Sequence, residues 1–239
     1  MSGELRDRVV LIGGATGGLG AGVAREFAQT EARLALASRS EAALEALAHD
    51  LGLPDDRVLT ATVDAADPAS VERLVTRVID RFGGLHALMN TIGGWGGGKT
   101  VGETPVEQWE RMLTLNLRSA FLMSRAVLPP MLEAGWGRIV HTASKSAVVP
   151  RPKQAGYAAS KMGVITLTEV IAAEVTGTGV TANVVLPSII DTPGNRRMMS
   201  SADTSKWVTP QQIGAVMRFL CSDSAASING ARVPVYGAV

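Results

Sequence analysis

The stretch Arg8-Val-Val-Leu-Ile-Gly-Gly-Ala-Thr-Gly-Gly-Leu-Gly20 decides the fold, because it joins an apolar run to a helical pattern through a glycine-rich turn. The apolar run is typical of a buried strand, and Leu19–Gln29 follows it with the spacing of a helix. Gly14, Gly18 and Gly20 let the backbone bend sharply and approach a pyrophosphate bound at the helix N-terminus. We interpret the stretch as a phosphate-binding strand–turn–helix unit; a plain glycine-rich connection is the alternative.

Outward from this unit, apolar runs alternate with helical patterns along the whole chain. We expect strands at Arg8–Ile12, Arg33–Ser38, Val58–Val63, Ala87–Thr91, Arg138–Thr142, Thr181–Leu186 and Arg232–Val235. We expect helices at Leu19–Gln29, Glu41–Leu51, Pro68–Phe82, Val106–Glu133, Gly156–Val175 and Pro210–Ser222. Most of the strand runs are apolar throughout, as in parallel strands buried on both faces. The alternation predicts an α/β fold, a doubly wound parallel sheet of the Rossmann type with helices on both faces.

Local signals support these helix boundaries. Pro68 and Pro105 stand at helix starts, while Gly83 and Gly135 follow helix ends. The pair Pro129–Pro130 predicts a kink or an end in the long fourth helix. The sequence contains no linker, repeat or low-complexity segment, so we expect a single domain over residues 1–239.

Composition narrows the functional classes. Of 239 residues 46% are hydrophobic, which is enough for a large core. The formal net charge is +1 and no basic patch is interleaved with aromatic residues, so we expect no nucleic-acid partner. Cys221 is the only cysteine, which excludes an intrachain disulfide and fits a reducing compartment. We find no signal core and no apolar run of membrane-spanning length, and therefore expect a cytoplasmic protein with no membrane partner.

One pair of residues indicates proton-transfer chemistry. Tyr157 and Lys161 are separated by four positions and share one face of a helix, with Ser144 upstream. A free phenol has a pKa of about 10, and a nearby cation lowers it. The pair therefore predicts an acid–base device beside a dinucleotide, which is carbonyl/alcohol redox chemistry. A surface contact without chemistry is the alternative for the pair alone.

Six motifs occur in order along the chain: Gly13–Gly20, Asn90–Gly93, Asn116 within Leu115–Ser119, Ser144, Tyr157 with Lys161, and Pro187-Ser188 followed by Thr192. The short-chain dehydrogenase/reductase family carries these motifs in the same order, and the chain resembles that family over essentially its whole length. The resemblance implies that Tyr157 donates and accepts the proton. It also implies that Lys161 binds the nicotinamide ribose and lowers the Tyr157 pKa. Ser144 would hold the substrate oxygen, and Asn116 would bind a water leading towards Lys161.

The same resemblance implies a cofactor site. Its candidate residues are Gly14, Thr16, Gly18, Leu19, Gly20, Ser38, Arg39, Asp64, Asn90, Gly93, Tyr157, Lys161, Pro187 and Thr192. After the second strand the chain has Arg39 and no carboxylate, so NADPH is favoured through the 2′-phosphate and NADH is possible. Arg39 facing solvent or adenine is the alternative. Asp64 matches the position that binds the adenine amino group, and a loop cap is its alternative.

The chain also departs from the family pattern. Gly13 replaces the threonine that usually fixes the turn, and Ser188 replaces a glycine. Thr91 and Ile92 replace Asn and Ala, and Tyr236 stands where many relatives have Asp. None of these changes removes a proton-transfer group, and together they point to a divergent branch.

A second, local resemblance is to quinonoid dihydropteridine reductases. It rests on Asp191–Met198 and on Gly93–Gly98 around Trp95, whose indole is a candidate to cover a flat substrate. That group generally uses NADH and lacks the serine found here as Ser144. We therefore interpret the chain as an NADPH-preferring oxidoreductase acting on a small carbonyl or secondary alcohol, with no metal. A dihydropteridine-type reductase and a non-catalytic dinucleotide-binding protein are the alternatives.

The two longest helices also predict self-association. Val106–Glu133 and Gly156–Val175 carry apolar residues around more of their circumference than one sheet face covers. Examples are Leu115, Leu122, Val164, Leu167 and Ile171. Members of the family commonly pair these helices, so we expect a homodimer or homotetramer. Complete coverage by the sheet and loops is the alternative.

Overall fold

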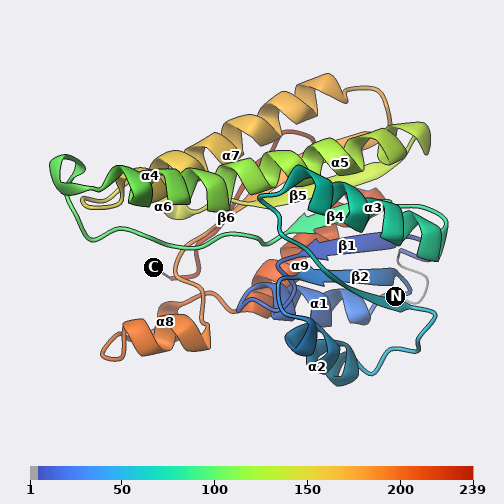
Figure 1. Cartoon of the computed structure of the whole chain (residues 1–239), viewed down its shortest axis with the longest axis horizontal. Coiled ribbons are helices and arrows are strands. Elements are labelled where there is room, and N and C mark those ends of the chain that lie inside the picture. The colour runs from blue at the N-terminus through green and yellow to red at the C-terminus, as the bar shows by residue number, and fades with distance from the viewer. Residues whose placement is uncertain (1–4, 239) are drawn as a thin grey trace.

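The computed structural model describes residues 5–238, which form one parallel sheet covered by helices on both faces (Figure 1). The strand order is β3-β2-β1-β4-β5-β6-β7. The strands are β1 Val9–Gly13, β2 Arg33–Ser38, β3 Val58–Thr62, β4 Ala87–Asn90, β5 Gly137–Thr142, β6 Val180–Pro187 and β7 Arg232–Val235. Each predicted strand agrees with its observed counterpart to within one residue at either end, and the doubly wound α/β prediction is confirmed.

Helices connect successive strands and bury one apolar face each. They are α1 Gly20–Ala28, α2 Glu41–Leu51, α3 Pro68–Phe82, α4 Val106–Met112, α5 Ser119–Glu133, α6 Lys145–Val148, α7 Ala155–Glu174, α8 Pro193–Met198 and α9 Pro210–Cys221. Figure 1 shows α3, α5 and α7 on one side of the sheet and α1, α2 and α9 on the other. Every other residue of a strand joins the core on one side; Val10 and Ile12 pack towards α1, whereas Leu11 packs towards α3.

The helix prediction was wrong at two places. The expected helix Val106–Glu133 contains a π-turn at Leu113–Arg118 that separates α4 from α5. In contrast, Pro129 and Pro130 do not end the helix, since α5 continues through both to Glu133. They lie in its last two turns, where only a few main-chain hydrogen bonds are lost. The short helices α6 and α8 were not predicted.

The strand order reverses direction between β1 and β4. From β1 the chain builds outward to β2 and β3, and then returns to place β4 on the other side of β1. Ligands of open α/β sheets bind outside the carboxyl ends of the strands at such a switch point. Here the glycine turn after β1 meets the segment after β4, because the Thr91 amide donates to the Gly13 carbonyl at 2.9 Å.

Candidate active site

The structure brings three of the predicted catalytic residues together at the carboxyl end of β5. Ser144 follows β5 and caps α6, while Tyr157 and Lys161 lie one turn apart near the start of α7. The Ser144 side chain is hydrogen-bonded to the phenol of Tyr157. Ser144 and Lys161 are both buried. Tyr157 is half-buried. A hydroxyl, a phenol and an ammonium group therefore gather at the carboxyl end of β5.

Burial dominates the electrostatics of these groups. Burial raises the pKa of Tyr157, and the hydrogen bond from Ser144 offsets only part of that effect. Burial lowers the pKa of Lys161 to about 8. The Lys161 ammonium donates to the Thr142 carbonyl at 2.7 Å. Burial is thus the main influence on the Tyr157 pKa here, and the expectation that Lys161 lowers it stays a prediction.

Asn116 lies in the π-turn, and its side chain binds the segment that follows β4. Its side-chain oxygen accepts from the Gly94 amide at 2.9 Å, and its amide group donates to the Gly94 carbonyl at 3.2 Å. The same amide donates to Ser160 at 3.1 Å. A Cβ on Gly93 would lie 2.7 Å from the Asn116 oxygen and 2.8 Å from Lys161 Nζ. Segment 90–94, called the β4 turn below, is therefore packed directly on the candidate lysine.

The glycine turn has the shape that a pyrophosphate requires. Gly14 has φ +78°, and a Cβ on Gly20 would lie 2.1 Å from the Gly14 carbonyl. No side chain caps the first turn of α1, which follows the glycines directly. Such an uncapped N-terminus attracts anionic groups. These residues fit a bound dinucleotide.

Side chains from elsewhere fix this turn. Gly13 lacks the usual threonine hydroxyl, but the Thr91 hydroxyl donates to the Gly13 carbonyl at 2.7 Å instead. Thr16 is hydrogen-bonded to Ser38 at the end of β2. A Cβ on Gly18 would lie 2.7 Å from the methyl group of Thr192. Thr192 follows β6, which ends at Pro187, and caps α8.

The two residues expected to contact adenosine lie at the rim. Arg39 is exposed and pairs with no carboxylate within residues 5–238. The Asp64 carboxylate accepts from the Ala66 amide at 2.9 Å, so it does cap its own loop. The loop cap, which is the alternative role of Asp64, is therefore present. The second carboxylate oxygen of Asp64 takes no part in that hydrogen bond.

Sequence reasoning missed His141 and the Thr142 carbonyl. His141 is fully buried on β5 and contacts Asn90 and Ser124. The available signal was a titratable residue inside an otherwise apolar strand, which must be hydrogen-bonded when buried.

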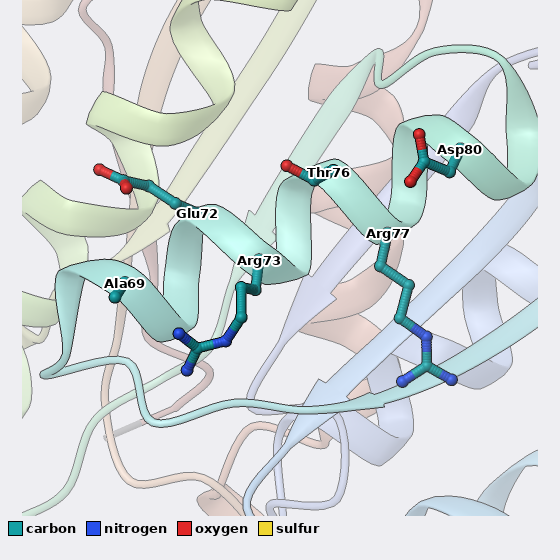
Figure 2. Close-up of a pocket in the computed structure, with 6 residues that line it drawn as sticks. All are labelled: Ala69, Glu72, Arg73, Thr76, Arg77 and Asp80. Carbon is teal, nitrogen blue, oxygen red and sulfur yellow. The ribbon is translucent and has the colours of Figure 1, made fainter.

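A surface hollow on α3 is remote from these groups. It measures about 430 Å³ and lies along the outer face of α3 (Figure 2). Its lining residues are Ala69, Glu72, Arg73, Thr76, Arg77 and Asp80. All come from one helix, and Figure 2 shows Arg73 and Arg77 extending away from it. An open helix face with mixed charges offers no catalytic geometry, so we assign the site by its chemistry at β5 and α7 instead.

Comparison with known proteins identifies the family. Residues 8–203 match the short chain dehydrogenase family. The chain belongs to this family. D-threitol dehydrogenase of Mycolicibacterium smegmatis is 35% identical over 243 residues, which cover 98% of this chain and 93% of the relative. D-beta-hydroxybutyrate dehydrogenase of Rhizobium meliloti is 31% identical over 252 residues, covering 96% and 97%.

Solved structures of relatives have the same fold. The crystal structure of levodione reductase has a TM-score of 0.89 at 33% identity, and 97% of each chain is covered. This short-chain dehydrogenase is therefore an NAD(P)-dependent oxidoreductase. No helix within residues 5–238 is long and apolar enough to cross a bilayer. Within the same range no group of three or more His, Cys, Asp or Glu side chains is placed to hold a metal ion.

Proposed function

We propose that this dehydrogenase interconverts a ketone and a secondary alcohol with Tyr157 as proton donor and acceptor. The hydrogen bond between Ser144 and Tyr157, beside the buried Lys161, is the observation that carries the proposal. Burial raises the pKa of Tyr157, which keeps the phenol protonated at neutral pH and suits it to donate a proton in reduction. The whole chain acts as one domain, and its single cysteine supports a cytoplasmic setting.

Each group then has one task. The nicotinamide, when bound, supplies or receives the hydride. Ser144 holds the substrate oxygen, and Tyr157 gives its proton to that oxygen or takes it back. Both donors are in place before charge develops, which is the efficient arrangement for stabilising it. Lys161 binds the ribose hydroxyls, and its charge then favours the phenolate during alcohol oxidation.

The chain's own residues also hold the dinucleotide. Gly14, Gly18 and Gly20 with Thr16 and Leu19 receive the pyrophosphate, and Ser38, Arg39 and Asp64 take the adenosine end. Asn90, Gly93, Pro187 and Thr192 lie around the nicotinamide half. Asn116 seats the β4 turn beside Lys161, and the water that it is expected to bind stays a prediction.

Replacing Tyr157 by Phe tests the acid–base role. Activity should fall by about 10²–10⁴-fold, the usual effect of losing a general acid, while cofactor affinity stays within about twofold. The chain offers a matched control, because Tyr236 is its only other tyrosine. Tyr236→Phe should leave turnover of a ketone panel unchanged. Near-normal kcat in Tyr157→Phe would refute the assignment.

We further propose a preference for NADPH over NADH. Arg39 is exposed and has no carboxylate partner within residues 5–238, so its guanidinium is available to a 2′-phosphate. Arg39→Ala should raise KM for NADPH more than KM for NADH, whereas Arg73→Ala on α3 should change neither. Equal KM values for both cofactors in the unmutated enzyme would rule out the preference. The dihydropteridine-type alternative stays a prediction.

A further inference from the structure

His141 lies fully buried in β5, where its imidazole joins two neighbouring elements. Asn90 of β4 is its register partner across the sheet. Nδ1 of His141 lies 3.1 Å from the Asn90 side-chain nitrogen, and Nε2 lies 2.9 Å from the Ser124 hydroxyl on α5. No candidate catalytic role uses this imidazole, although it lies one residue before Thr142, which binds Lys161.

The hydrogen bonds around His141 fix the position of its proton. The Ser124 hydroxyl donates to the Ala120 carbonyl at 2.8 Å, so its oxygen is left to accept from Nε2–H. On the other side Nδ1 accepts from the amide group of Asn90. A second proton on Nδ1 would oppose that amide donor, so the ring stays neutral. Burial, and next the charge of Lys161, lower its pKa to about 3.

Asn90 is thereby held in one orientation. Because its amide nitrogen donates to His141, its oxygen is directed to the Ile92 amide at 3.2 Å. The Asn90 carbonyl also accepts from the Thr142 hydroxyl at 2.9 Å. The imidazole of His141 therefore sets the orientation of the Asn90 side chain, at the point where the β4 turn leaves the sheet.

Small displacements of this turn would disturb both halves of the site. On one side, a Cβ on Gly14 would lie 3.0 Å from the Ile92 amide nitrogen. On the other side, Gly93 is packed against Lys161 and Asn116. The turn thus lies between the phosphate-binding glycines and the candidate catalytic lysine, with little room to move in either direction.

We propose that His141 is a positioning residue for cofactor binding, acting through Asn90 on the β4 turn. The chemistry that matters is a neutral acceptor at Nδ1. The hydrogen bond from Nε2 to Ser124 aligns the ring and does not touch the turn.

Two substitutions separate this role from simple packing. His141→Asn retains an acceptor near the Nδ1 position and loses the contact with Ser124. His141→Leu loses both contacts at similar bulk. Thr30→Val is the matched control, because Thr30 is likewise buried with two local hydrogen bonds but lies at the end of α1, away from the turn. The readouts are the dissociation constants of NADPH and NADH from nicotinamide fluorescence, together with Tm.

We expect His141→Leu to weaken the tighter-binding cofactor by about tenfold to 10²-fold, as a misplaced site does, with His141→Asn within about threefold of the unmutated protein. Thr30→Val should lower Tm without changing either dissociation constant. Equal loss of cofactor affinity in all three variants, or none in His141→Leu, would overturn the proposal. If the unmutated protein turned over no ketone but bound cofactor, the proposed reaction would fail while this test still stood.

A second measurement needs no variant. Imidazole ¹⁵N chemical shifts of the unmutated protein should report the Nε2–H form of His141 throughout pH 5 to 9. A protonated Nδ1 in that range would contradict the geometry, whatever the variants do. The result also keeps the proposal testable if His141→Leu does not fold.

Discussion

A buried neutral histidine makes stability depend on pH in a defined direction. The pKa of His141 is about 3 in the folded protein, against about 6.5 for an exposed imidazole. Below about pH 6.5 the unfolded chain binds a proton that the folded chain does not, so the free energy of unfolding falls as pH is lowered towards 3. The slope from this residue is about 1.4 kcal/mol per pH unit.

His141→Asn should remove that slope. Urea denaturation at pH 8, 6 and 5 is the measurement, and the difference between the two proteins isolates His141 because other groups, including His86, titrate in both. The unmutated protein should lose more stability between pH 6 and 5 than the variant does. Parallel curves would show that His141 is not neutral in the fold.

The second residue-scale prediction concerns Lys161 and the cofactor. Burial holds the pKa of Lys161 at about 8 in the free protein. An anionic dinucleotide favours the charged form and raises this pKa, so binding takes up protons above pH 8. Cofactor affinity should therefore be highest below pH 8 and fall as pH rises through it. Calorimetry in buffers of different ionisation enthalpy measures the proton uptake.

The control for this effect is Lys161→Met. Its affinity should be weaker at every pH and should lack the decline above pH 8. An unmutated protein whose affinity stays flat between pH 7 and 9.5 would contradict the prediction.

At the residue scale the sequence predicted what is local. Tyr157 and Lys161 share a helix face because of their spacing alone, and Ser144 closes the preceding strand. The contacts of His141 and the Thr142 carbonyl depend instead on how β4 and β5 align, which no local pattern shows. The direction of the Tyr157 pKa depends on burial, and burial is likewise a property of the assembled fold.

At the element scale the missed features have tertiary causes. The π-turn at Leu113–Arg118 carries Asn116, whose side chain binds both main-chain groups of Gly94. A one-residue widening of a helix is costly by itself and is often retained at functional sites. Helix propensity depends only on the residues of segment 106–133 and carries no information about the contact between Asn116 and Gly94. The sequence therefore predicted an unbroken helix.

The loop after the β4 turn gives an element-scale prediction. Its tip is tied to the segment before α7, because the Gly98 amide donates to the Lys153 carbonyl at 2.8 Å. A Cβ on Gly97 would lie 2.4 Å from that same carbonyl. Gly97→Ala should therefore displace the loop, cost about 1–3 kcal/mol of unfolding free energy and raise substrate KM.

Gly102 provides the control for this loop. A Cβ there meets nothing within 4 Å, so Gly102→Ala should change stability by less than about 0.5 kcal/mol. Denaturation curves and KM for a ketone compare the two variants. If Gly97→Ala resembles Gly102→Ala in both, the loop is not held as the structure indicates.

At the scale of the whole molecule the fold was predictable because its signal repeats. Each apolar run and each helical pattern is short and local, and their alternation admits few topologies. Which helix faces stay uncovered is less predictable. The sequence predicted uncovered apolar surface at Leu122, Val164 and Ile171, but all three side chains are buried within the chain. They pack against the sheet and neighbouring helices, so the prediction was wrong for these three residues.

Other apolar side chains on the same helices are exposed, so self-association stays a prediction. Phe121 on α5 is 48% exposed, and Met162 and Val170 on α7 are 36% and 49% exposed. Figure 1 shows α5 and α7 together in the outer layer on one side of the sheet. Pairing this layer with a second copy about a twofold axis would cover all three residues in both chains. We therefore expect a homodimer, or a homotetramer built from it, in sedimentation velocity at micromolar concentration.

Charge substitutions locate the contact. Phe121→Lys should shift the protein towards monomer, because a buried unpaired ammonium is costly in an interface. Phe219 on α9 is also 48% exposed but lies on the other side of the sheet, so Phe219→Lys should retain at least the dimer. Circular dichroism confirms that both variants fold. A monomeric unmutated protein would contradict the assembly, and a dimer insensitive to Phe121→Lys would place the contact on a different face.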